Sequence, residues 1–182
     1  MVPVYSAGRQ LTKVRAVMAG SVVFLSIFLW LAWDSFQTYG LRPADGGQLA
    51  SFGVRLAWGL GLTALGLAFP AGMWAYGLRY VAAIRRDEST GMVDIDTLRG
   101  LWRHTTRVPA ASVHFGESHA GRLRTAKHTV KAPWTSLRVD GLAHSLILDD
   151  QGHLLDAEFP QELRRSARLS RSGQGAGPRG AA

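Results

Sequence analysis

The sequence predicts an α+β membrane protein in which a two-helix transmembrane hairpin precedes a small antiparallel β domain and a disordered tail. Three observations lead to this fold class. Two long runs without charge lie in the first half of the 182 residues, short alternating segments follow, and the last residues are mostly Gly, Ser, Pro and Arg. Charge divides the chain in the same way, because residues 1–86 carry +6, residues 87–158 carry −2 and residues 159–182 carry +4.

The first uncharged run is "AVMAGSVVFLSIFLWLAW", from Ala16 to Trp33. A helix rises about 1.5 Å per residue and the hydrocarbon core is about 30 Å thick, so about 20 apolar residues cross it. The run predicts a transmembrane helix over 16–36, after a cytoplasmic N-terminal segment over 1–15. We expect no cleaved signal peptide, because the run is too long for a signal sequence and no small-residue cleavage site follows it.

The second run, "LAWGLGLTALGLAFPAGMWAYGL", predicts a transmembrane helix over 55–80 after a short external loop over 37–54. The alternative is a pair of buried helices in a soluble core, for which the chain has too little other material to cover both runs. Aromatic residues gather at both ends of the runs, as in interfacial belts. Basic residues flank the outer ends, so the positive-inside rule places both termini in the cytoplasm, or in the matrix of a mitochondrion.

Small residues recur along the second predicted helix at spacings of three and four, which places them on one stripe. In lipid, helices associate where small side chains let their backbones approach closely. The stripe is therefore a predicted helix-packing interface, either with the first helix, through Ala16, Ala19 or Gly20 and Val23, or with a larger membrane protein. Its residues are Ala57, Gly61, Ala64, Ala68, Gly72 (or its neighbour Ala71) and Ala75.

The β domain is predicted over 87–165. Val93 and Ile95 alternate with Asp94 and Asp96, which indicates a strand with one buried face and one solvent-exposed face. Further short strands are expected at "LWRHTTRVP" and "SVHF", and a meander at 134–140, 143–148 and 153–158 with turns at Asp-Gly and "DDQG". A helix is expected at "PQELRRSARL", and residues 166–182 are expected to be a disordered tail.

The expected core of this domain is modest for its size, so contact with a partner would help to stabilise it. Its predicted members are Val93, Ile95, Leu98, Val108, Val113, Phe115, Leu137, Val139, Leu146, Leu148, Leu154 and Phe159.

Residues that could carry chemistry do not form a recognisable motif. The chain has no cysteine, and its histidines lack the spacing of a metal site, although His114, Glu117, His119 and His128 lie close in sequence. No nucleophile elbow, phosphate-binding loop or dinucleotide fingerprint is present. We therefore expect no catalytic residue, no metal and no cofactor, and surface positions for the histidines. Trp102 and Trp134 are read as core or interface anchors.

One basic stretch, "HAGRLRTAKHTVKAPW", carries no acid. It indicates a contact with lipid headgroups or with an acidic patch of a partner, and a solvated loop is the alternative. The residues proposed for this contact are Arg122, Arg124, Lys127 and Lys131. Nucleic acid is not an expected partner, because the excess charge belongs to the flanks and tail rather than to one folded face.

The lead-in "VYSAGRQLTKVRAV", the hairpin, and a β domain containing "PWTSLRVDG" and "LILDDQGHLLDAEF" resemble the two-span inner-membrane assembly factors of respiratory complexes, of the kind linked to cytochrome c oxidase biogenesis. The similarity covers residues 4–160. It implies a non-enzymatic role with the C-terminal domain on the cytoplasmic or matrix side. No Arg- and Ser-rich transit leader is recognised, which favours a bacterial inner membrane.

We therefore expect a non-enzymatic accessory subunit or assembly factor of a larger respiratory or photosynthetic membrane complex. It would dock through the second helix and the β domain. The alternative function is a membrane-surface module that recognises anionic lipid. An enzyme is the third possibility.

Overall fold

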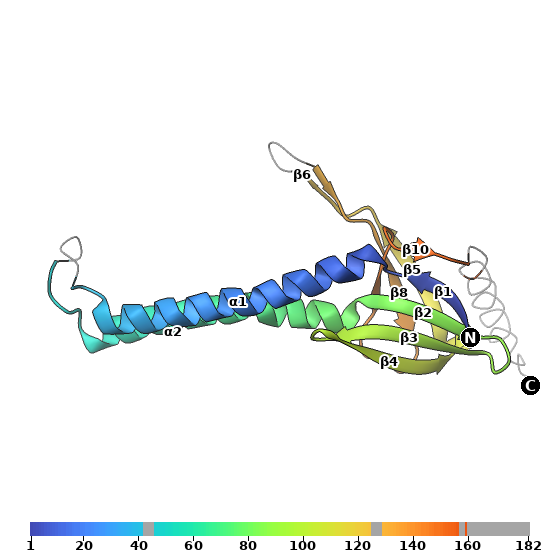
Figure 1. The fold of residues 1–182 in the computed structure, drawn as a ribbon, viewed down its shortest axis with the longest axis horizontal. Helices are drawn as coiled ribbons and strands as arrows, with labels where there is room; N and C mark the ends of the chain where they lie inside the picture. Colours follow the sequence, from blue (N-terminus) through green and yellow to red (C-terminus); the bar gives the residue numbers. More distant parts are fainter. Residues whose placement is uncertain (42–45, 125–128, 157–158, 160–182) are drawn as a thin grey trace, which may run out of the picture. The chain divides into compact units, whose positions relative to one another are not determined.

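The structure is a computed structural model that describes residues 1–41, 46–124, 129–156 and 159, with only the backbone described for 122–124 and 129–131. The chain divides into two compact units (Figure 1). One is helical and covers Lys13–Tyr76, and the other is a β unit that joins Met1–Thr12 to Gly77–Ala182. The predicted tail, the helix expected after Pro160 and Lys127 lie outside the described residues.

Two long helices confirm the helical part of the predicted fold class. Helix α1 covers Arg9–Thr38 and helix α2 covers Phe52–Arg79. Both are long and apolar enough to cross a membrane, and only 17% and 6% of their most apolar 18-residue windows are buried within the chain. Such low burial is not that of core helices in a soluble protein, which are covered on all sides. The first helix begins seven residues before the predicted start at Ala16.

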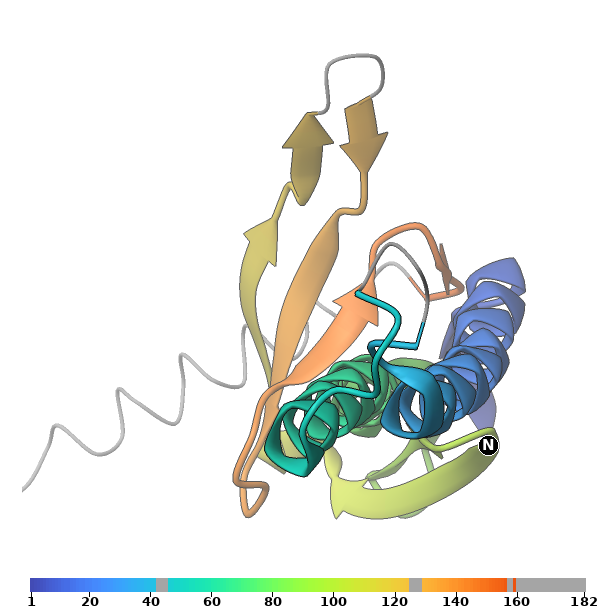
Figure 2. The same cartoon turned by 90° about the vertical axis from the view of Figure 1, so that its left-hand side faces the viewer.

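The two helices run side by side (Figures 1 and 2) and contact each other through aromatic and small residues. The rings of Phe24 and Phe69 meet edge to face with centroids 5.4 Å apart, and those of Tyr39 and Trp58 lie 5.6 Å apart. Near the loop, Arg55 donates a hydrogen bond from Nη1 to the carbonyl of Phe36 at 3.0 Å. These contacts join residues 24–39 of α1 to residues 55–69 of α2.

The larger sheet of the β unit has five antiparallel strands in the order β10-β1-β2-β3-β4. Strand β1 lies before the helical hairpin, and the other four lie after it. Their bounds are β1 Val2–Ser6, β2 Val81–Asp87, β3 Met92–Arg99, β4 Trp102–Pro109 and β10 His153–Leu154.

This sheet extends the β domain beyond the predicted range of 87–165. The sequence predicts a cytoplasmic N-terminal segment over 1–15 and no strand within it, whereas β1 pairs with both β2 and β10. Strand β2 follows α2 after a single residue, Tyr80, which was assigned to the helix. The alternation in 81–87 was hidden because "VAAIRR" reads equally well as the end of an apolar helix.

A second sheet has three antiparallel strands in the order β5-β8-β9. A 3-10 turn at Ala110–Ser112 leads into it, and a small hairpin of β6 and β7 joins β5 to β8. The bounds are β5 Val113–His119, β6 Arg122–Arg124, β7 Thr129–Lys131, β8 Trp134–Val139 and β9 Leu146–Asp149. The strands expected at 134–140 and 143–148 are confirmed, with the second displaced by three residues at its start.

The third strand of the predicted meander takes a different partner. Among the described residues of 153–158, only His153 and Leu154 form a strand, and they pair with Ser6 and Tyr5 of β1 rather than with β9. The short segment after β9 therefore links the second sheet to the first. The phenol of Tyr5 supports this link, because its hydroxyl donates a hydrogen bond to the carbonyl of Asp149 at 2.9 Å.

The core of the β unit contains nine of the twelve predicted residues. Val108 and Phe115 are half-buried, and Leu154 is 45% exposed because it lies on a strand at the edge of the sheet. The residues that were missed belong to β1, to β2 or to the turns beside them. They are Val4, Tyr5, Ala7, Tyr80, Val81, Ala82 and Ile84.

Candidate functional site

The predicted small-residue stripe lies on the exposed side of α2. Ala57, Gly61, Ala64, Ala68, Gly72 and Ala75 are all exposed within the chain. A Cβ atom added at Gly61 or at Gly72 would meet nothing within 4 Å. We call these six residues the small-residue face.

The opposite side of α2 contacts α1. A Cβ atom added at Gly66 would lie 2.6 Å from Cβ of Phe28, and one added at Gly59 would lie 3.5 Å from the carbonyl oxygen of Ala32. At about 100° per residue, positions 59 and 66 lie roughly half a turn from the middle of the small-residue face. The glycines that let the two helices approach are therefore different from those of the predicted stripe.

This arrangement corrects one reading of the stripe, that it packs on α1 through Ala16, Ala19 or Gly20, and Val23. All four of those residues are exposed as well. On α1, the buried positions are Leu11, Met18, Ser21 and Ala32. Counting small residues at three- and four-residue spacing identified a face, but it could not tell which of two glycine rows faces the neighbouring helix.

The basic stretch forms part of the hairpin of β6 and β7. Arg122 pairs with Lys131 across the two strands, and Arg124 pairs with Thr129. Lys127 lies outside the described residues. The backbone register therefore brings two of the four predicted contact residues to neighbouring positions.

A second exposed feature, which the sequence reading did not single out, is the turn between β3 and β4. Gly100 has φ of +63° and, with Leu101, forms a two-residue turn between paired Arg99 and Trp102. Leu101 is 47% exposed and Trp102 is 80% exposed. Trp102 therefore does not belong to the core. Of the two roles predicted for it, core residue or interface anchor, only the second is left. Trp134 is half-buried, and its ring stacks on His119 with centroids 4.1 Å apart.

A buried carboxylate lies on the same hairpin. The side chain of Asp96 is 2% exposed, although the alternation of 93–96 predicted that it faces water. Nη2 of Arg85 donates to both carboxylate oxygens at 2.9 and 3.0 Å, and the hydroxyl of Thr105 donates to Oδ1 at 2.7 Å. The Asp96 carboxylate is satisfied by side chains of the neighbouring strands, so the cluster stabilises the sheet and does not resemble a reactive site.

Other ionisable groups have local partners too. Hydrogen bonds from the side chains of Ser89 and Thr90 lower the pKa of Asp87 to about 2, and Arg107 lies 3.0 Å from its Oδ2. His114 lies 3.1 Å from Oδ2 of Asp140. Among the residues that the structure describes, no three His, Cys, Asp or Glu side chains come together as a group that could hold a metal ion.

Comparison of the chain with models of protein families, with curated proteins and with solved structures gives no match. The function is therefore inferred from the chain's own surfaces. These are the small-residue face of α2, the exposed turn of Leu101 and Trp102, and the hairpin of β6 and β7.

Proposed function

We propose that this protein is a non-enzymatic, membrane-anchored accessory subunit or assembly factor that docks on a larger integral membrane complex through α2. One observation carries the proposal: the small-residue face of α2 is exposed, while a different row of glycines contacts α1. A lipid-facing surface has no need of small side chains. A helix–helix contact uses them, because they allow backbones to approach closely.

Membrane anchorage rests on the length and exposure of both helices. The 28 residues of α2 would extend for about 42 Å, more than the roughly 30 Å of hydrocarbon. Their apolar side chains are largely uncovered within the chain. Insertion in a bilayer would bury this surface and would remove the cost of exposing it to water.

The pairing of β1 with β2 supports a single-sided topology. These strands flank the helical hairpin in sequence and form neighbouring strands of one sheet. A hairpin that crosses the membrane twice returns the chain to its starting side, which allows this pairing. The basic residues beyond the outer ends of the hairpin favour the cytoplasmic side of a bacterial inner membrane, or the matrix side in a mitochondrion.

We base the type of partner complex on the sequence resemblance to assembly factors of respiratory complexes. We propose an energy-transducing complex, respiratory or photosynthetic, as the partner. Native separation after gentle solubilisation tests this directly. The expected result is migration of this chain with one large, identifiable membrane complex.

A pair of variants makes that test specific for the helix face. Gly61→Leu with Ala68→Leu fills the small-residue face, so we expect it to release the chain from the complex. The matched control is Ala19→Leu with Gly20→Leu, which adds the same bulk at exposed positions of α1. Equal release by both pairs, or by neither, would contradict docking through α2.

A second function is favoured by Trp102, which lies 80% exposed between Arg99 and Arg103. An aromatic ring beside cationic side chains suits the headgroup region of a bilayer with anionic lipid. The β unit would then bind the membrane surface through this turn, and the exposed turn is a better-supported contact than the basic stretch predicted from sequence.

The absence of cysteine allows a clean test of this second function. An environment-sensitive fluorophore is attached at Trp102→Cys in the full chain, in nanodiscs of phosphatidylcholine with or without phosphatidylglycerol. Surface binding predicts a blue shift that grows with phosphatidylglycerol and weakens with salt. The control label at Glu88→Cys is at the other end of β3 and should not shift. Identical spectra from both labels would contradict the contact.

A further inference from the structure

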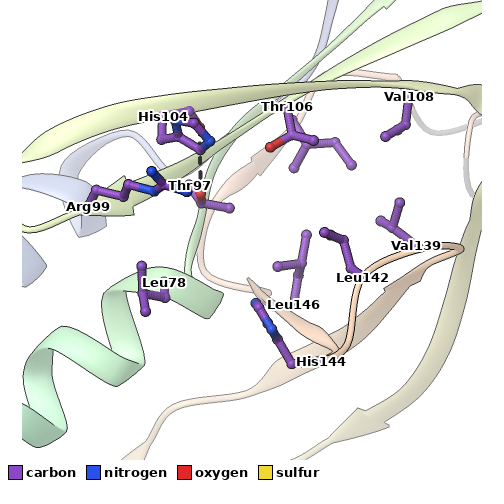
Figure 3. A pocket seen from close by; sticks show the side chains of 11 residues that line it. Leu78, Thr97, Arg99, His104, Thr106, Val108, Val139, Leu142, His144 and Leu146 are labelled. Carbon is purple, nitrogen blue, oxygen red and sulfur yellow. Dashed lines mark hydrogen bonds between the residues drawn. The ribbon is translucent and has the colours of Figure 1, made fainter.

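A cavity of about 280 Å³ lies between the two sheets of the β unit (Figure 3). Strands β3 and β4 supply one wall, and β8, β9 and the loop between them supply the other. This volume is near the lower end of the roughly 300–1,000 Å³ typical of small-molecule sites.

The deep walls of the cavity are apolar. Ile95, Val139 and Leu146 are buried and line it. Leu78, Val108 and Leu142 add further apolar side chains to the lining (Figure 3). The hydroxyl of Thr97 donates to the carbonyl of His104 at 3.4 Å, so it is already satisfied. Such a surface would hold an alkyl chain and offers little to a polar ligand.

Three basic side chains lie at the rim. Arg99 and His104 come from the hairpin of β3 and β4, and His144 approaches from the loop opposite (Figure 3). Within the described part of the chain, no carboxylate lines the cavity, and Arg99 has no salt-bridge partner. Asp96 lies in register with Thr105, on the face of the hairpin away from the cavity, where Arg85 neutralises it. The rim therefore favours an anionic group.

The cavity lies at the end of the β unit where the chain leaves α2. Leu78, in the last turn of that helix, is part of its lining together with Arg99. Gly100 and then the exposed Leu101 and Trp102 follow Arg99 in the sequence.

From these observations we propose that the cavity binds a single-chain amphiphile with an anionic head. The head, a carboxylate or a phosphate, is held by Arg99 with His104 and His144, and the alkyl chain lies between the sheets. The site is separate from the small-residue face, so it adds a ligand-binding activity to the proposed docking role. The ligand class has two possible sources, a soluble fatty acid or phosphate ester, and a lysolipid from the bilayer.

Binding is tested on the full chain in phosphatidylcholine nanodiscs, because free detergent would compete as an amphiphile. Octanoate and octyl phosphate are titrated by calorimetry against empty discs. We expect each anion to bind saturably, with one molecule per chain. Its affinity should be at least about tenfold higher than that of octanol, which lacks the charge, or of octylammonium, which carries the opposite charge, because charge-assisted hydrogen bonds are strong. Non-saturable partition equal to that of empty discs would overturn the proposal.

Two variants locate the ligand within the cavity. Arg99→Gln should weaken both anions about tenfold, whereas Arg103→Gln, on the same hairpin but outside the lining, should leave them unchanged. Leu142→Trp fills the cavity from an exposed loop position and should abolish binding. Unchanged hydrogen exchange in β3 and β4 shows that each variant is folded. Equal binding by the Leu142→Trp protein would overturn the proposed location.

A final arm separates the two sources. Lysophosphatidylglycerol added to the discs should displace octanoate if the site accepts a bilayer lipid, whereas failure to displace assigns it to soluble anions. The binding and displacement results do not depend on docking of α2, because none of these cavity variants changes the small-residue face. Gly61→Leu with Ala68→Leu should bind octanoate normally, so failure of either proposal leaves the other testable.

Discussion

Arg85 holds the buried carboxylate of Asp96 with two hydrogen bonds, at 2.9 Å to Oδ1 and 3.0 Å to Oδ2. The pair joins β2, which follows α2 and is the central strand of the larger sheet, to its neighbour β3. Asp96 is 2% exposed and Arg85 is 41% exposed. The arginine therefore keeps partial contact with water while it neutralises a charge that has almost none.

Removing that arginine should destabilise the β unit. Arg85→Ala leaves the Asp96 carboxylate with Thr105 and a distant Arg103, so we expect the free energy of unfolding to fall by about 2–3 kcal/mol. Arg103→Ala is the matched control, since that arginine is 3.9 Å away and half-exposed, and should cost less than about 1 kcal/mol. Hydrogen exchange of the β3 amides measures both effects. Equal protection in the two variants would contradict the assignment.

Strand β1 should be required for a stable β unit. Val4 is 1% exposed, so Val4→Asp buries a charge without a partner and should lower the free energy of unfolding by more than about 3 kcal/mol. Val2 is on the same strand and is 45% exposed, and Val2→Asp should change stability by less than about 0.5 kcal/mol. Thermal unfolding followed by near-ultraviolet circular dichroism distinguishes them. If Val4→Asp matches Val2→Asp, β1 is not part of the sheet.

The two glycine rows of α2 should respond differently to added bulk. Gly66→Leu would force a side chain against Phe28 and separate the helices, at a cost of about 1–3 kcal/mol. Gly61→Leu meets open space and should leave the hairpin intact. Phe24→Cys with Phe69→Cys, joined by a short bismaleimide, reports helix contact in membranes. Loss of cross-linking in the Gly61→Leu protein rather than in Gly66→Leu would reverse the assignment of the two faces.

Asp87 should titrate well below an ordinary aspartate. Hydrogen bonds from Ser89 and Thr90 lower its pKa from the usual 3.8 to about 2. A pKa that is lower in the folded state adds stability above about pH 4, and this contribution is lost as the pH falls toward 2. Ser89→Ala should move the pKa of Asp87 back toward 3.8. A carboxyl-carbon titration by NMR measures the shift, and an unchanged value would assign the effect elsewhere.

The helices and most strands could be predicted from sequence because their patterns are local. Uninterrupted apolar runs identify α1 and α2, and the period-two alternation around Val93 and Ile95 identifies β3. The pairing of β1 with β2 could not be predicted, because it joins residues about 80 positions apart and nothing in "VPVYS" specifies its partner. For the same reason, the burial of Val4 and Tyr80 in the core could not be predicted.

The candidate sites could be predicted only in part, because they too depend on contacts between residues that are distant in the sequence. The small-residue stripe could be found from its spacing, but the side of α2 that it occupies depends on where Phe28 and Ala32 lie. The cavity brings Arg99 and His104 together with His144, which is 40 residues further along the chain, so no local pattern reveals it. Asp96 appeared to face water because alternation ignores the arginine that neutralises it.

Site-specific photo-cross-linking in native membranes tests the proposed docking most directly. A photoreactive residue replaces Ala64 on the small-residue face or, as the control, Leu67, which is 49% exposed and lies about a quarter-turn from the middle of that face. Docking predicts one discrete cross-linked membrane protein from position 64, absent from position 67 and identifiable by mass spectrometry as a subunit of a larger complex. Cross-links only to lipid, at both positions alike, would contradict it.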